Sequence, residues 1–505
     1  MNKRGFRWFV CVAGSVMVMS AGLPVGVVGA GPASASAASP TVTGPVDGGT
    51  PAEALFSTSF NLAKVGYQEK EFFISGTATS YTSASPLTSD GKWTVTPGVT
   101  APYTTRVVVR RPINPAKFNG TVIVEWLNVS GEVDAGPEWT LAHNELIRDG
   151  FVWVGVSAQQ AGVNAAKGKV PKLTPGDPVR YAPLSHPGDS FSYDIFSQAG
   201  QAIRDNSALM LGGLTLHKLI AAGESQSAAR LVTYIDAVQP LVHEYDGFLV
   251  HSRFATGDAL SQAPQVTVPA PATAMIRTDL GVPVFVFETE TDVFNSNLAD
   301  RQPDTSMFRL WEVAGGSHYD EYGLVIGPED TGNGQGAVLN LAAMRHPPRT
   351  IPIPGSTPFS CDVPINTSGT HWVLDAAFYW LNQWVVNGTL PPVGPLMQTT
   401  HVSPVVFARD ANGNVIGGVR SPQVDAPVAA LGGVGNNGTG PVGKFCFLFG
   451  TTKPFSATKL ASLYKTHAQF VAKWDAAAQK AVKGGFLRPL DAVELDNAAA
   501  ASHIG

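Results

Sequence analysis

The chain has 505 residues, of which 44% are hydrophobic and only 14% are charged, with a formal net charge of −5. This low charge density excludes a disordered polyampholyte, and it excludes a nucleic-acid-binding protein that needs a dense Lys/Arg surface. The length allows about three domain-sized pieces, although a large α/β protein can also form one core with insertions.

The first 37 residues have the features of an export signal. Three cations among the first seven residues precede an apolar run over residues 8–19, and Ala-x-Ala cleavage sites end at Ala35 and Ala37. An uncleaved membrane anchor is the alternative, but several Gly and Pro residues between positions 14 and 29 would make a poor spanning helix. We therefore expect residues 1–37 to be a signal peptide, the mature protein to be secreted or associated with the cell envelope, and no membrane contact after cleavage.

The middle of the chain alternates between strand-like and helix-like segments. Residues 38–54 are rich in Pro, Gly and Thr and are predicted as a linker. Because the later apolar runs lack polar alternation, they are expected to be buried on both faces. The alternation predicts an α/β fold with a mostly parallel central sheet that has helices on both sides. The predicted strands are 71–74, 105–110, 121–127, 151–156, 218–222, 248–251, 283–287 and 308–313, and the predicted helices between them are 138–149, 190–204 and 226–238.

Beyond residue 320 the pattern is looser. Helical spacing of apolar residues predicts a helix over 371–386 and a long helix over 456–482. A polar turn between two strand-like runs predicts a hairpin within 405–419. We therefore predict a single domain over 55–485 with extra loops, this hairpin and a C-terminal helical segment, followed by a tail over 486–505.

The most informative motif is Gly223-Glu224-Ser225-Gln226-Ser227, which follows an apolar strand and precedes small, helix-forming residues. A strand–turn–helix arrangement of this kind exposes the serine hydroxyl at the end of a strand, and small neighbours are needed because helix and strand pack closely there. The motif ends in Ser227, where the usual form has glycine. A serine-rich turn before a helix is the alternative, but the position between a buried strand and a helix favours Ser225 as a nucleophile.

A serine nucleophile needs a base and an orienting acid. In this arrangement the chain order should be Ser, then Asp or Glu, then His. His318 directly follows the last predicted strand of the sheet, at the same edge as Ser225, where loops converge on one crevice. We predict that His318 takes the proton of Ser225, although a loop histidine near a glycine turn is the alternative.

Three carboxylates compete for the role of the acid. Glu288, Glu290 and Asp292 follow the predicted strand 283–287, and they would share a direction if that segment stayed extended. Asp292 lies furthest into the loop. We predict Asp292 as the triad acid, with Glu290 as the alternative.

Backbone N–H groups should stabilise the negative charge that develops on a carbonyl oxygen during acyl transfer. One is expected from Gln226, the residue after the nucleophile, and another from the loop after the strand 121–127. In that loop Val129 and Ser130 are the candidates, and an ordinary turn is the alternative.

Cysteine and histidine usage predicts a disulfide and no metal site. Cys11 would leave with the signal, so Cys361 and Cys446 form the remaining pair, and an exported protein favours a disulfide between them over two separate thiols. No cysteine or histidine cluster has zinc-ligand spacing, and no Gly-x-Gly-x-x-Gly follows a strand, so we expect no metal and no cofactor. His251 and His371 stand beside apolar runs and are predicted as structural histidines.

Several longer segments resemble a known family. These segments are Gly223–Tyr234, Tyr245–Arg253, Glu290–Val293, Arg309–His318, Cys361–Asn366 and Leu448–Phe455. Through them the chain resembles a secreted member of the α/β-hydrolase superfamily, and more narrowly the "alpha/beta hydrolase domain" group of bacterial proteins, over residues from about 55 to 480. The resemblance implies an α/β-hydrolase fold, and it places the triad acid at Asp292 rather than Glu290.

Two classes of function agree with these residues. The first is a serine hydrolase that cleaves small-molecule carboxylic esters through an acyl-enzyme intermediate, with an amidase or a lactonase as its close variant. The second is a non-catalytic secreted binding protein that keeps a hydrolase scaffold. The complete order of Ser, Asp and His favours the enzyme.

Overall fold

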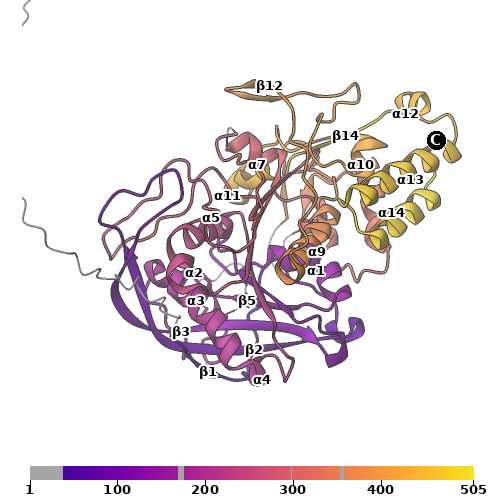
Figure 1. Cartoon of the computed structure of the whole chain (residues 1–505). Coiled ribbons are helices and arrows are strands. Elements are labelled where there is room, and N and C mark those ends of the chain that lie inside the picture. Colours follow the sequence, from indigo (N-terminus) through magenta and orange to yellow (C-terminus); the bar gives the residue numbers. More distant parts are fainter. Residues whose placement is uncertain (1–37, 169–175, 297, 353–357) are drawn as a thin grey trace, which may run out of the picture. The chain divides into compact units, whose positions relative to one another are not determined.

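The computed structural model describes residues 38–168, 176–296, 298–352 and 358–505, which Figure 1 shows in ribbon form. The predicted signal segment 1–37 lies outside the described residues.

Nine strands form one sheet in the order β1-β2-β3-β5-β4-β6-β7-β8-β9. Strands β1, β2, β3 and β5 pair with one another antiparallel, and every pair from β5 through β4 to β9 is parallel. The mostly parallel sheet is therefore confirmed. The strands are β1 (Thr41–Thr43), β2 (Tyr67–Thr82), β3 (Thr96–Pro112), β4 (Thr121–Trp126), β5 (Val152–Val156), β6 (Lys218–Glu224), β7 (Gly247–His251), β8 (Val284–Thr289) and β9 (Phe308–Val313).

Helices cover both faces of the parallel strands because alternate side chains of each strand point to opposite faces. In β4, Val122 and Val124 face a core built with α3 (Ser192–Asp205) and α5 (Gln226–Thr233). Ile123 faces the other core, which contains side chains of α1 (Pro137–Arg148) and α9 (His371–Asn387). Because these strands are buried on both faces, their apolar sequences lack polar alternation.

The region after β9 contains short strands and helices. The strands are β10 (Thr350–Ile351), β11 (Phe359–Ser360), β12 (Thr399–Val402), β13 (Val405–Phe407), β14 (Ala429–Gly432) and β15 (Thr451–Pro454). The remaining α-helices of the described chain, before and after β9, are α2 (Gln160–Ala166), α4 (Ser207–Met210), α6 (Gln239–Val242), α7 (Glu290–Asn295), α8 (Gln335–Arg345), α10 (Pro422–Asp425), α11 (Gly440–Gly443), α12 (Ala457–Leu463), α13 (His467–Gly484) and α14 (Pro489–Ala501).

Several predicted elements differ from the structure. Strands β2 and β3 are much longer than the predicted strands 71–74 and 105–110. The hairpin forms between β12 and β13, earlier than predicted, and the polar turn at Asp410–Asn414 closes only a single bridge between Arg409 and Val415. The predicted helix 456–482 is interrupted between α12 and α13, because Thr466 caps a new helix by accepting a hydrogen bond from the Gln469 N–H.

The segments predicted as linker and tail both contain ordered elements. Strand β1 lies within 38–54 and pairs with β2, and α14 lies within 486–505 and packs against α13. Figure 1 shows α13 and α14 side by side at the C-terminal end. Both segments therefore carry part of the fold, while the domain boundary itself stays a prediction. Within the described ranges, no helix has the length and hydropathy needed to cross a membrane.

Candidate active site

Ser225 lies in the turn between β6 and α5, as the motif predicts. Its backbone φ is 60° and its ψ is −116°, a strained conformation for a residue with a side chain. The turn is held by a hydrogen bond from the Ser225 N–H to the His251 carbonyl oxygen at 2.9 Å. The side chain is placed at the carboxyl edge of the parallel strands, where loops can bring other groups to it.

The serine at the last position of the motif fits the turn for a physical reason. A Cβ on Gly223 would lie 3.1 Å from backbone atoms of Ser227, so helix and strand are in close contact there. The Ser227 hydroxyl donates to the Glu224 carbonyl oxygen at 2.8 Å and accepts from the Glu224 N–H at 3.1 Å. Ser227 thus adds two hydrogen bonds to the turn that glycine could not make.

His318 lies between Ser225 and Asp292. Its Nε2 is 2.7 Å from the Ser225 hydroxyl oxygen, and its Nδ1 is 2.6 Å from Asp292 Oδ1. The loop after β9 carries His318, and the His318 N–H donates to the Thr291 hydroxyl at 3.1 Å. The structure therefore brings together the three residues predicted as a triad.

The Asp292 carboxylate is fixed by hydrogen bonds as well as by His318. Oδ2 accepts from the Ser252 hydroxyl at 2.8 Å, the Thr289 N–H at 2.8 Å and the Thr289 hydroxyl at 2.6 Å. Burial alone would raise the pKa of Asp292, but the adjacent imidazole and these donors lower it below its usual value. The group is therefore a carboxylate that can accept the Nδ1–H of His318.

The alternative acids point elsewhere. Glu290 accepts hydrogen bonds from the Gly315 N–H at 2.7 Å, the Gly433 N–H at 3.1 Å and Arg409 at 3.0 Å. Glu288 is buried, and neither of its carboxylate oxygens has a hydrogen-bond partner among the described residues. Helix α7 begins at Glu290, so the extended segment assumed for these carboxylates ends there and they take different directions.

The predicted oxyanion-hole residues differ in the state of their N–H groups. Gln226 is the first residue of α5, so its N–H has no acceptor within the helix. The Ser130 N–H donates to Asn128 Oδ1 at 2.8 Å and is occupied. Among the described residues, no acceptor is found for the Val129 N–H. Of the two loop candidates, Val129 is therefore the one whose N–H remains available to an oxyanion.

Sequence reasoning missed Glu224 and Ser252, which also contact the candidate triad. Glu224 Oε1 is 3.1 Å from His318 Nε2, and Ser252 holds Asp292. Glu224 belongs to the serine motif itself, but only its position at the end of β6 directs its side chain toward His318. Ser252 has a positive φ of 52°, which no sequence signal indicated.

The two histidines predicted as structural are both buried. His251 Nδ1 lies 3.3 Å from Glu138 Oε2. The His371 ring stacks on Tyr322 with ring centroids 3.4 Å apart, and its two nitrogens have no hydrogen-bond partner among the described residues. Burial lowers the pKa of His371 far below its usual value, so this ring is neutral.

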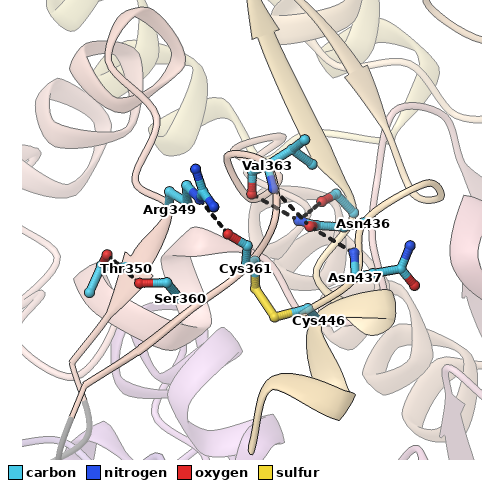
Figure 2. The surroundings of a disulfide bond; sticks show 9 residues. Arg349, Thr350, Ser360, Cys361, Val363, Asn436, Asn437 and Cys446 are labelled. Carbon is cyan, nitrogen blue, oxygen red and sulfur yellow. Dashed lines mark hydrogen bonds between the residues drawn. A yellow bond between two sulfur atoms is a disulfide. The ribbon is translucent and has the colours of Figure 1, made fainter. Parts of the chain in front are cut away.

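Cys361 and Cys446 form a disulfide, as predicted, with their Cα atoms 5.6 Å apart. Figure 2 shows that Asn436 lies beside the bond and exchanges hydrogen bonds with the backbone of Val363. The cross-linked segments also reach the loop of His318. Asn366 donates from Nδ2 to the Gly315 carbonyl oxygen at 2.7 Å, and the Tyr319 N–H donates to the Leu448 carbonyl oxygen at 3.2 Å.

Two further features lie outside the triad. A cavity of about 410 Å³ is lined by residues of the segment 52–69, by residues of β3, and by Ile113, Leu127 and Trp153, and by none of the three triad residues. In the part of the chain that the structure describes, no group of three or more His, Cys, Asp or Glu side chains is arranged to hold a metal ion.

The strand order and the serine turn between β6 and α5 define the α/β-hydrolase fold. A family model described as "Alpha/beta hydrolase domain" matches residues 42–497, and the chain belongs to this family. Comparison with curated proteins returns no match.

Among solved structures, the chain is similar to a putative dienelactone hydrolase from Klebsiella pneumoniae subsp. pneumoniae MGH 78578, with 12% identity over 48% of this chain and 85% of the other and a TM-score of 0.25. It is also similar to a fungal esterase from Rhizomucor miehei, with 15% identity over 51% and 78% of the two chains and a TM-score of 0.25. A glucuronoyl esterase from Solibacter usitatus has 9% identity over 49% and 76% of the two chains and a TM-score of 0.26.

Proposed function

We propose that the protein is a serine hydrolase of small-molecule carboxylic esters, with Ser225 as nucleophile, His318 as general base and Asp292 as orienting acid. One observation carries the proposal: His318 lies within hydrogen-bond distance of Ser225 through Nε2 and of Asp292 through Nδ1, and Ser225 lies on the strained turn of an α/β-hydrolase. The arrangement is the one that nucleophilic catalysis by serine requires.

The proposed reaction has two halves. In the first, the Ser225 oxygen attacks the ester carbonyl carbon while its proton passes to His318 Nε2, and the N–H groups of Gln226 and Val129 face the oxyanion. The alcohol leaves with the proton from Nε2, which leaves an acyl group on Ser225. In the second, a water molecule gives a proton to Nε2 as its oxygen attacks the acyl carbon. The bond from that carbon to the Ser225 oxygen then breaks, and the oxygen takes the proton back from Nε2, so that a carboxylic acid and free Ser225 are formed.

Amides and lactones are the close alternatives, because the same groups attack any activated carbonyl carbon. A non-catalytic binding protein is the distant alternative. Such a protein has no need of a hydroxyl, an imidazole and a carboxylate in hydrogen-bond series, so the geometry favours the enzyme.

Labelling with a fluorophosphonate probe and turnover of a short p-nitrophenyl ester test the proposal. The wild type should react with the probe at Ser225, and Ser225→Ala should lose ester turnover by about a millionfold while it stays folded. His318→Ala should lose a similar factor. A folded Ser225→Ala protein that keeps most of the wild-type turnover would exclude Ser225 as the nucleophile.

We also propose that the protein is exported and cleaved after Ala37. Strand β1 begins at Thr41, so this cleavage would leave every described strand intact. The N-terminal residue of the exported protein should then be Ala38, and a different residue found by N-terminal sequencing would contradict the site.

A further inference from the structure

His318 Nε2 faces two oxygen atoms rather than one. The Ser225 hydroxyl lies 2.7 Å away, and Glu224 Oε1 lies 3.1 Å away. Glu224 is the last residue of β6, it is buried, and the triad mechanism does not use it. A carboxylate this close to the base changes how readily the base holds a proton.

Groups from several elements surround Glu224. Asn128 Nδ2 donates to the Glu224 carbonyl oxygen at 3.0 Å and lies 3.5 Å from Oε2. The register of β6 and β7 pairs Glu224 with His251, whose Nδ1 lies 3.3 Å from Glu138 of α1.

The charges around Glu224 include few cations. The titratable groups that act on it, besides those of β7 and α1, are His318 and Tyr319 of the loop after β9 and Asp292 of α7. Among the described residues, no Lys or Arg forms an ion pair with Glu224. The histidines are therefore the positive partners that this carboxylate has.

The surroundings raise the pKa values of both Glu224 and His318. Burial raises the pKa of Glu224 to about 7, although His318 and His251 counteract it. Burial alone would lower the pKa of His318, but the carboxylates of Asp292 and Glu224 raise it above its usual value. The two carboxylates therefore favour the protonated imidazole of His318.

The protonation state of His318 Nε2 determines the effect of its contact with Glu224. Nε2 carries either one proton or one lone pair. When it carries the lone pair, an ionised Glu224 is repelled by it; when it carries the proton, Glu224 and Ser225 can both accept from it. Ionised Glu224 thus favours the imidazolium, which is the form that His318 takes as Ser225 loses its proton.

We propose that Glu224 is a positioning residue that stabilises the imidazolium of His318 in the transition state and, by the same contact, moves the active pH range of the enzyme toward alkaline values. The inference rests on the proposed function. Glu224 acts through His318 and makes no bond to the ester. The two effects are inseparable, because stabilisation of the imidazolium in the transition state also stabilises it in the inactive resting form.

The test is the pH profile of kcat/KM for a short p-nitrophenyl ester in the wild type and in Glu224→Gln. We expect the substitution to lower the alkaline plateau by roughly 10- to 100-fold and to move the acid limb down by about 1 to 2 pH units. Towards acidic pH, the lower plateau reduces kcat/KM while the lower position of the acid limb raises it, so the profiles of the wild type and Glu224→Gln should converge. A residue with a merely structural role would lower the rate equally at every pH.

Glu244→Gln is the matched control. Glu244 is also buried, and burial raises its pKa to about 7. However, it pairs with Arg204 and lies just before β7, at the amino ends of the parallel strands, whereas Ser225 lies at their carboxyl ends. Its substitution should leave the position of the acid limb unchanged. A shift of the limb in this variant equal to that in Glu224→Gln would overturn the assignment.

The outcomes separate the inference from the proposed function. If Glu224→Gln keeps the turnover of the wild type and its acid limb does not move, the role of Glu224 is overturned and the proposed function is unaffected. Absence of both turnover and fluorophosphonate labelling in the wild type overturns the proposed function. If Glu224→Gln does not fold, imidazole ¹⁵N shifts of His318 in the Ser225→Ala protein decide instead: the inference expects an imidazolium that persists above pH 7, and a neutral ring at pH 6 overturns it.

Discussion

The Asp292 carboxylate receives three hydrogen bonds besides the contact with His318, and each comes from a residue next to a strand end. Thr289 ends β8, and Ser252 follows β7 with a positive φ that turns its hydroxyl toward Asp292. These donors hold one carboxylate oxygen, so that the other is free for Nδ1 of His318. The imidazole is thereby held in one tautomer and one orientation.

Asp292→Asn should remove this control of the tautomer. The amide would present N–H groups to Nδ1 and leave the proton on the wrong nitrogen, so we expect ester turnover to fall by roughly ten-thousandfold with little change in substrate KM. Steady-state kinetics with a p-nitrophenyl ester measures both quantities.

Glu290→Gln is the control for Asp292→Asn, because Glu290 is the alternative acid. Its carboxylate binds Arg409 and two backbone N–H groups away from His318, so its loss should lower the free energy of unfolding by roughly 1–3 kcal/mol and turnover far less. The reverse order of the two effects on turnover would make Glu290 the orienting acid.

The buried strands can be predicted from the sequence, whereas the contacts between loops cannot. Strands β4 to β9 were predicted within a few residues because continuous apolar runs bounded by turns have few other interpretations. The order of Ser, Asp and His followed from strand ends that meet at one edge of a parallel sheet. The contact of Glu224 with His318 depends on strand register and on the path of the loop after β9, neither of which a local pattern encodes.

The hairpin at β12 and β13 shows the limit of local turn signals. Asp410 holds the predicted turn through hydrogen bonds from the N–H groups of Asn412 and Asn414 to its side chain. The preceding run, Val405–Phe407, nevertheless pairs backward with β12. A turn signal therefore predicted the turn and not the partner of the strand, because partner choice depends on tertiary packing.

The disulfide joins two segments that support the loop of His318. Asn366 follows Cys361 and bonds to Gly315, and Leu448 follows Cys446 and accepts from Tyr319. Reduction should therefore lower the thermal midpoint of unfolding. The free energy of unfolding should fall by at most about 4 to 5 kcal/mol for a closed loop of this length. It should also reduce activity at temperatures below global unfolding, because the His318 loop loses part of its support.

Activity and circular dichroism, measured over one temperature range with and without reductant, check this expectation. The Cys361→Ser/Cys446→Ser double variant is the control, since reductant should change nothing in it. Equal midpoints for reduced and oxidised wild type would show that the bond adds no stability.

The two faces of the sheet and the C-terminal helices form separate buried clusters. The third cluster combines side chains of α8, α12, α13 and α14 with residues of α9, α10 and β14. Helix α14 is also tied to α1, where Arg148 pairs with Asp491 at 2.7 Å. The C-terminal residues thus connect their own cluster to a helix that covers the sheet, and the apparent tail is part of the fold.

Two leucines of α14 test this role of the C-terminal segment. Leu495 is 1% exposed in the third cluster, whereas Leu490, on the same helix, is 57% exposed. Leu495→Ala removes buried methyl groups and leaves a cavity, so it should lower the free energy of unfolding by about 2–5 kcal/mol. Leu490→Ala loses little contact and should change it by about 0.5 kcal/mol or less. Urea unfolding followed by tryptophan fluorescence measures both, because Trp474 of α13 is buried in the same cluster. If the two variants unfolded at the same urea concentration as the wild type, residues 486–505 would be a tail that the fold does not need.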